Sequence, residues 1–213
     1  MNSTEKEISY KSTNSYSILN NLTEATKNVW FVCHGMSYLS RYFLKYFKDL
    51  NPDENYIIAP QAQSKYYIPP TYKHVGASWL TKENTLRETD NVMRYYDAVL
   101  ETENISKDKN IIVVGYSQGV SVAMRYIANR QLHCSQLVLM SGGIPKELVA
   151  DDFKFLEEKT KITMIYGTQD EYLNDERMQS ESNRVIELFG NNVTIKPFDG
   201  KHIVNVELIN GLV

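Results

Sequence analysis

A strand-like apolar run that leads straight into a Gly-x-Ser-x-Gly motif constrains this chain more than any other stretch. Residues 111–114 are Ile-Ile-Val-Val, a continuous β-branched run typical of a strand buried on both faces. Gly115-Tyr116-Ser117-Gln118-Gly119 follows at once, and residues 120–128 can then form an amphipathic helix. At such a turn the apex residue is strained and usually left-handed, while flanking glycines let strand and helix close around it. The motif therefore predicts that Ser117 presents its hydroxyl at the carboxyl end of a sheet as a nucleophile.

The five-residue motif alone is short enough to occur by chance, so its surroundings carry the interpretation. A strand before it and a helix after it are the context in which a nucleophilic serine is found. A serine hydroxyl is a weak nucleophile near neutral pH, so it needs a general base, and the base needs a third group to orient it. Both groups are expected from later parts of the chain.

Four histidines are candidates for the general base. His202 lies in a glycine-containing loop after the last expected strand, at the sheet edge where the serine should be. His34 follows an early strand and suits a structural role, His74 lies in an aromatic segment and is a candidate for substrate contact, and His133 opens a strand at the opposite, solvated edge. His202 is therefore the predicted base; the alternative is an ordinary loop histidine.

The orienting acid is expected between the serine and the histidine, after a late strand. Asp170 fits this position because it follows the apolar residues 162–166 and Gly167. Its role would be to hold the imidazole tautomer and to stabilise the imidazolium without taking the proton itself. Glu171 and Asp175 are less well placed, and Asp199 is close in sequence to the histidine but on the wrong loop. The alternative for Asp170 is a solvated helix cap.

Stabilising the oxyanion of an acyl-transfer intermediate requires fixed N–H donors. One donor is expected from the backbone of Gln118, which follows the serine at a helix amino terminus that favours negative charge. The second is expected from the loop after Cys33-His34-Gly35, at the backbone of Met36. Only main-chain groups are used, so the identities of these two side chains say little.

Strands and helices alternate along the chain without a repeat, low-complexity tract or linker. The expected strands are 28–33, 56–59, 111–114, 136–140, 162–166 and 193–197, with one or two edge strands in 10–20. The expected helices are 37–50, 85–103 (opened by a Thr85-x-x-Glu88 capping box), 120–128, 180–189 and a short one from 203. This order predicts an α/β fold: a mostly parallel central sheet, helices on both faces, and ligands at the carboxyl ends of the strands. Residues 1–213 are expected to form a single domain.

Residues 60–84 fit neither a helical nor a strand period. A long loop without regular structure is usually functional or disordered, and this one is too aromatic for disorder. We interpret it as a packed loop near the active site, with Tyr66, Tyr67, Tyr72 and Trp79 as tentative walls of a substrate pocket. The alternative is a plug at the sheet edge. The chain leaves no room for a large lid domain.

Composition and charge exclude several classes of function. A net charge of −3 gives no basic field for nucleic acid. The polar start lacks the apolar stretch of a signal peptide, and no apolar run approaches the length of an integral membrane segment. Cys33 and Cys134 are expected to be reduced core thiols, and no metal-binding motif such as His-Glu-x-x-His is present, so no metal is expected. We expect a cytoplasmic protein acting on a small molecule, with its oligomeric state open.

Several of these stretches resemble the phospholipase/carboxylesterase family of the α/β-hydrolase superfamily, which includes acyl-protein thioesterases and small bacterial carboxylesterases. The resemblance runs from about residue 29 to 204. It rests on His34-Gly35, Ala59-Pro60-Gln61-Ala62, Ala77-Ser78-Trp79, Gly115-Tyr116-Ser117-Gln118-Gly119, Gly167-Thr168-Gln169-Asp170 and Gly200-Lys201-His202. It implies a serine esterase cleaving carboxylic esters or thioesters, with Ser117, Asp170 and His202 as the catalytic triad and no cofactor.

Two positions depart from the pattern of that family. Ser37 and Val120 stand where the family usually has glycine, which is expected to reshape the oxyanion loop and to tighten packing of the helix after the serine. The aromatic segment favours short to medium acyl groups, cleaved through an acyl-enzyme on Ser117. Two other classes stay open: a non-catalytic binding protein on the same scaffold, and an enzyme that cleaves amides.

Overall fold

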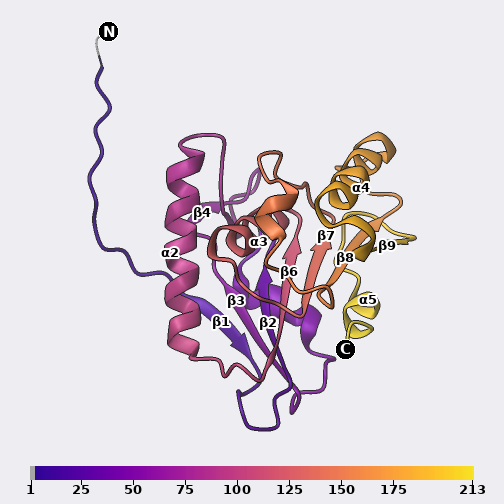
Figure 1. Cartoon of the computed structure of the whole chain (residues 1–213). Helices are drawn as coiled ribbons and strands as arrows, with labels where there is room; N and C mark the ends of the chain where they lie inside the picture. Colours follow the sequence, from indigo (N-terminus) through magenta and orange to yellow (C-terminus); the bar gives the residue numbers. More distant parts are fainter. Residues whose placement is uncertain (1–2) are drawn as a thin grey trace.

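The protein is built around a seven-stranded sheet with the strand order β1-β3-β2-β6-β7-β8-β9 (Figure 1). The computed structural model describes residues 3–213, without the side chain of residue 191. β1 pairs antiparallel with β3, and every other neighbouring pair in this sheet is parallel. The strands of this sheet are β1 (Tyr16–Leu19), β2 (Asn28–Cys33), β3 (Asn55–Pro60), β6 (Asn110–Tyr116), β7 (Gln136–Met140), β8 (Lys161–Gly167) and β9 (Val193–Phe198). The mostly parallel sheet is confirmed, with one edge strand in residues 10–20.

Helices cover both faces of the sheet, as the alternating pattern predicts (Figure 1). The α-helices are α1 (Ser40–Phe43), α2 (Thr85–Glu103), α3 (Gln118–Arg130), α4 (Asp175–Phe189) and α5 (Val206–Asn210), and the 3-10 turns are η1 (Leu44–Phe47), η2 (Ala150–Phe153) and η3 (Gly190–Asn192). α2, α3 and α4 contribute to one apolar core, and α1, η1 and α5 to a second core on the other face. All residues of β2, β3 and β7 are buried, which explains their continuous apolar runs.

The helix expected over residues 37–50 is much shorter than predicted. Leu39 is extended, and the N–H of Ser40 is capped by Oε1 of Gln61 at 2.9 Å, so α1 begins there and passes at once into η1. The apolar stripe is only partly buried, because Phe43 and Phe47 are in the core while Tyr42 is 57% exposed. A tertiary contact to the side chain of Gln61 sets the helix start, and no local signal reports it.

Residues 60–84 are not an irregular loop, contrary to the prediction. They contain an antiparallel two-stranded sheet of β4 (Ser64–Tyr67) and β5 (Val75–Ser78). β4 is mostly exposed and both strands are short, so no apolar alternation marks them.

The ends of two helices also differ from the predictions. α2 begins at Thr85 as expected, but the capping box is wrong: Asn84 is the N-cap, left-handed and without a side-chain capping bond. α4 begins before residue 180, at Asp175, because the side chain of Asn174 accepts the N–H of Arg177 at 2.9 Å.

Two further expectations concern membrane segments and cysteines. Across residues 3–213, the structure contains no helix both long and apolar enough to cross a bilayer. Cys33 and Cys134 are buried and unpaired, as predicted, and burial raises the pKa of each thiol to about 12. Both thiols are therefore protonated near neutral pH.

Candidate active site

The turn between β6 and α3 has the geometry expected of a nucleophile-bearing apex. Ser117 adopts φ 53° and ψ −120°, a conformation that costs a non-glycine residue roughly 1–3 kcal/mol. Its N–H donates to the carbonyl of Met140 at 2.8 Å, which ties the apex to the end of β7. A Cβ on Gly119 would lie 2.0 Å from the carbonyl oxygen of Cys33, so only glycine lets α3 approach the end of β2 this closely.

Ser117, His202 and Asp170 form one line of hydrogen bonds across three loops at the carboxyl edge of the sheet. His202 Nε2 lies 2.9 Å from Ser117 Oγ, and His202 Nδ1 lies 2.7 Å from Asp170 Oδ2. A carboxylate can only accept, so the proton of a neutral imidazole is on Nδ1. Nε2 then carries the lone pair that accepts the serine hydroxyl proton.

Burial and backbone contacts fix the carboxylate of Asp170. The residue is 6% exposed, and its Oδ1 accepts the N–H groups of Tyr172 at 2.9 Å and Leu173 at 3.0 Å. Both oxygens are therefore engaged, one with the backbone and one with the imidazole. This arrangement leaves the imidazole little freedom to rotate.

The alternative acids lie elsewhere. Glu171 Oε2 accepts the backbone N–H of His202 at 3.4 Å, and Asp199 accepts from the side chain of Gln169 at 2.7 Å. Asp175 is the first residue of α4. Among the acidic side chains that the structure describes, only that of Asp170 is hydrogen-bonded to the ring of His202.

Two tyrosines hold His202 in place. The Tyr116 hydroxyl donates to the backbone carbonyl of His202 at 2.9 Å, and the two rings lie 5.3 Å apart. Burial raises the pKa of Tyr116, so its hydroxyl stays protonated and remains a donor. The ring of Tyr172 packs edge-on against the imidazole at 4.9 Å. Sequence reasoning missed both contacts, although Tyr116 lies next to the serine in the motif.

The loop after β2 passes close to Ser117. A Cβ on Gly35 would lie 3.1 Å from the Cβ of Ser117, so the loop and the apex nearly touch. The next residue, Met36, has a half-exposed side chain, and no hydrogen-bond acceptor within residues 3–213 is found for its N–H. The N–H of Gln118, at the start of α3, is likewise without an acceptor in the described part of the chain. Both predicted oxyanion donors therefore have N–H groups that remain available to a substrate oxygen.

Ser37 keeps a left-handed backbone where the resembling family usually has glycine. Its φ is 69°, and its N–H donates to the carbonyl of Ala77 on β5 at 2.9 Å. Its hydroxyl lies 2.7 Å from the hydroxyl of Tyr66 on β4. A Cβ on Gly76 would lie 2.6 Å from the Cα of Ser37, so the β4–β5 hairpin is packed directly on the oxyanion loop.

The side chain of Gln118 forms a clamp that sequence reasoning missed. Its Oε1 accepts the N–H of Trp79 at 2.8 Å, and its Nε2 donates to the carbonyl of Leu80 at 2.7 Å. The residue after the serine therefore fixes the segment that follows the hairpin. Only its backbone had a predicted role, and nothing local to the motif indicates the partners of its amide.

His34 has the structural role that its position predicts. It is fully buried, its Nε2 accepts the N–H of Ala62 at 3.1 Å, and its Nδ1 then donates to the carbonyl of Gly35 at 2.7 Å. Burial lowers the pKa of His34 to about 4, so the ring is neutral near pH 7. His74 and His133 are both exposed.

The four predicted pocket residues separate into three kinds. Tyr66 is half-buried and holds the oxyanion loop, and Tyr67 and Tyr72 are 64% and 63% exposed. Trp79 is 1% exposed, and its indole N–H donates to the carbonyl of His34 at 2.8 Å. Trp79 is therefore a core residue beneath the oxyanion loop, and its prediction as a pocket wall is wrong.

As for metals, no group of three or more His, Cys, Asp or Glu side chains able to hold an ion is found in residues 3–213.

Comparison with curated proteins gives no match. The model of the phospholipase/carboxylesterase family matches residues 15–210.

Solved structures give the same picture at the level of the fold. Acyl-protein thioesterase 2 of Zea mays superimposes with a TM-score of 0.68 at 14% identity, covering 94% of this chain and 96% of that one. A phospholipase/carboxylesterase of Dyadobacter fermentans gives 0.64 at 18%, covering 95% and 97%. The Bacillus cereus carboxylesterase gives 0.64 at 12%, covering 94% and 92%. Because the family model spans nearly the whole chain, the protein belongs to the phospholipase/carboxylesterase family and has the α/β-hydrolase fold.

Proposed function

We propose that the protein is a serine esterase that hydrolyses carboxylic esters of short to medium acyl groups through an acyl-enzyme on Ser117. The observation that carries the proposal is the unbroken hydrogen-bonded line from Ser117 Oγ through His202 to the buried Asp170, with distances of 2.9 and 2.7 Å. Membership in this family, and the likeness to proteins named carboxylesterase and thioesterase, support a hydrolase of esters, with thioesters as further candidate substrates.

In the first step Ser117 Oγ attacks the carbonyl carbon, and its proton passes to Nε2 of His202. Asp170 stabilises the imidazolium, while the N–H groups of Met36 and Gln118 donate to the carbonyl oxygen as it becomes negative. The intermediate collapses by breaking the bond to the alcohol oxygen, which takes the proton from Nε2 and leaves an acyl-enzyme. Water then attacks the acyl carbon and gives a proton to Nε2, and collapse returns that proton to Ser117 and releases the acid.

Ser117→Ala tests this proposal because it removes the attacking oxygen and leaves the fold intact. We expect the kcat on a short p-nitrophenyl ester to fall by about 10⁴-fold or more, and labelling by a fluorophosphonate probe to disappear. Ser121→Ala, a change to another serine on α3, serves as the matched control and should keep both activity and labelling. Full activity in the Ser117 variant would refute the proposal.

Asp170→Asn tests the orienting role separately. An amide at this position can present a donor to Nδ1 and stabilise the wrong tautomer, so kcat should fall by roughly 10³–10⁴-fold while the fluorescence and circular dichroism of the fold stay unchanged. A panel of matched esters, thioesters and amides of increasing acyl length on the wild type then defines the substrate. Faster cleavage of amides than of matched esters would favour the amide-cleaving alternative.

A further inference from the structure

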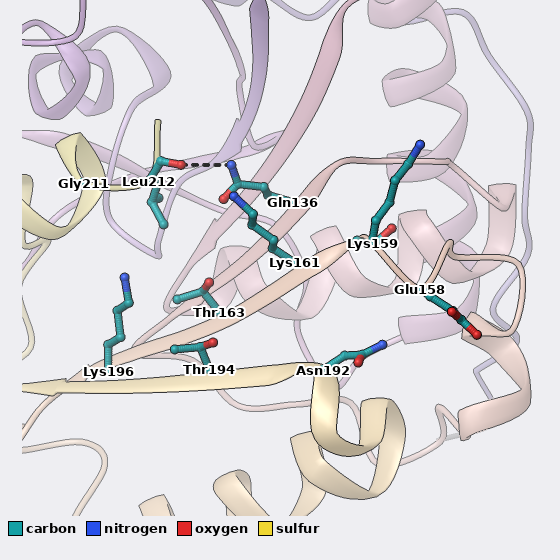
Figure 2. Close-up of a pocket in the computed structure, with 11 residues that line it drawn as sticks. Gln136, Glu158, Lys159, Lys161, Thr163, Asn192, Thr194, Lys196, Gly211 and Leu212 are labelled. Atoms are coloured by element: carbon teal, nitrogen blue, oxygen red, sulfur yellow. Dashed lines mark hydrogen bonds between the residues drawn. The ribbon is translucent and has the colours of Figure 1, made fainter.

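A cavity lies at the opposite edge of the sheet from the triad. It has a volume of about 330 Å³ and lies at the amino ends of β7, β8 and β9, beside the end of α5 (Figure 2). β8 starts in this cavity at Lys161 and leads away from it toward Asp170, which follows its carboxyl end. The cavity therefore lies apart from the proposed esterase site.

The floor of this cavity is polar. The same face of the sheet becomes apolar toward the carboxyl end of β8. Side chains two residues apart on a strand point to the same face, so Lys161 and Thr163 share the face of Ile165, which is 1% exposed in the core under α5. On β9, Thr194 pairs with Thr163 and Lys196 pairs with Ile165. Thr163, Thr194 and Lys196 line the cavity, whereas Ile165 lies in the core to which α5 contributes.

One polar side chain of the floor is deeply buried and lacks a protein partner. Thr163 is 5% exposed and lines the cavity, and its hydroxyl has no hydrogen-bond partner among the described side chains and backbone. Gln136 beside it is 8% exposed and uses its amide N–H on the carbonyl of Leu212 at 3.0 Å. A hydroxyl that lines a cavity and has no protein partner is free to bind water or a ligand.

The charges around the cavity favour an anion. Lys161 and Lys196 have no ion-pair partner within the part of the chain that the structure describes, although the protein carries a net charge of −3. Figure 2 shows both lysines on the same side of β8 and β9 as the two threonines, while the Glu158 carboxylate points away from them. Two free ammonium groups flanking hydroxyl donors make a local positive site on a negative molecule.

We propose that this cavity, which we call the β8–β9 pocket, binds a small ligand through a phosphate or diphosphate group. Its donors are ammonium groups, threonine hydroxyls and the amide of Asn192, each of which can hydrogen-bond to a phosphate oxygen. No arginine lines it, so the planar fork that favours a carboxylate is missing. Its volume is at the lower end of the range for small-molecule sites.

Calorimetric titration with inorganic pyrophosphate at fixed ionic strength tests the proposal. The wild type should bind one equivalent, and Lys161→Gln and Lys196→Gln should each weaken binding by about tenfold. Thr163→Val should weaken it severalfold at constant charge, since valine matches threonine in shape. Lys82→Gln is the matched control, an exposed lysine before α2 with no ion pair among the described residues, and should bind like the wild type.

The Ser117→Ala variant distinguishes this pocket from the esterase site. It should bind pyrophosphate with the same affinity as the wild type. Amide chemical shifts should move at the amino ends of β8 and β9, and thermal unfolding should show that each variant is folded. The proposal is overturned by an absence of saturable binding, by equal affinity in the Lys82→Gln and Lys161→Gln proteins, or by loss of binding in Ser117→Ala. Each of these results leaves the proposed esterase activity untouched.

Discussion

Two serines at the candidate active site have left-handed backbone conformations. Ser117 at the apex has φ 53° and Ser37 in the oxyanion loop has φ 69°, and each conformation costs a non-glycine residue roughly 1–3 kcal/mol. Both are held by backbone hydrogen bonds to strand ends, from Ser117 to Met140 at 2.8 Å and from Ser37 to Ala77 at 2.9 Å. The surrounding sheet and hairpin therefore maintain the strain that the local sequence does not favour.

Buried His34 makes stability depend on pH in a predictable direction. Its pKa is lowered to about 4 in the folded protein from 6.5, so between these values the unfolded chain binds a proton that the folded chain does not. The contribution of His34 to the free energy of unfolding is therefore fully present above pH 6.5 and is lost as the pH falls toward 4. From pH 7 to pH 5 the loss due to this residue should be about 2 kcal/mol.

His34→Gln provides the comparison, because its amide can still bond the Ala62 N–H but does not titrate. Urea unfolding at pH 7 and pH 5 should show a smaller fall in the free energy of unfolding for the variant than for the wild type. Equal falls in the two proteins would mean that folding does not lower the pKa of His34.

The sequence predicts those site residues whose chemistry is local to a motif. Ser117 follows a buried strand, and Asp170 and His202 each follow a strand end in the expected order, so spacing and residue type suffice. Trp79 and the side chain of Gln118 were misjudged or missed because their partners come from a segment about 40 residues away in the chain, with separations of 39 and 38 residues in the two clamp bonds. The burial of an aromatic side chain depends on such distant contacts and cannot be predicted from the residues next to it in the sequence.

At the scale of elements, the β4–β5 hairpin is the support of the oxyanion loop. It reaches this loop through the backbone bond from Ser37 to Ala77 and through the hydroxyl contact to Tyr66. The position of Met36, the candidate oxyanion donor, then depends on a hairpin that the sequence pattern does not reveal. The hairpin is short and largely exposed, so its structure depends on its contacts with the loop after β2.

Gly76→Ala should disturb this support while leaving the core intact. The new Cβ would lie 2.6 Å from the backbone of Ser37, so hairpin and oxyanion loop must move apart. A displacement of about 1 Å in a catalytic group can cost 10²-fold, so we expect kcat on a p-nitrophenyl ester to fall about tenfold to hundredfold. Gly211→Ala is the control, since its nearest contact would be an ordinary 3.5 Å. An unchanged kcat in folded Gly76→Ala protein would show that the hairpin does not position the loop.

At the scale of the whole molecule, the two faces of one sheet carry separate cores that share every central strand. Residues alternate between them along β2, so that Phe31 contributes to the core under α2, α3 and α4, while Trp30 contributes to the core under α1 and α5. If the central strands separated from one core, the apolar side chains of the other core would be exposed as well. The same shared strands connect the triad at one edge to the β8–β9 pocket at the other.

The two tryptophans report on these cores separately, because Trp30 lies in one and Trp79 in the other. If residues 1–213 form a single domain, Trp79→Phe and Trp30→Phe proteins, each with one remaining tryptophan, should unfold in one transition whatever the probe. In each variant, the urea midpoint from tryptophan fluorescence should coincide with that from far-ultraviolet circular dichroism. Each indole donates one buried hydrogen bond, to Asn55 or to His34, so both variants should be destabilised by about 1–3 kcal/mol. A fluorescence transition that separates from the circular dichroism in either variant would mean that one face can unfold alone, and the single-domain prediction would be wrong.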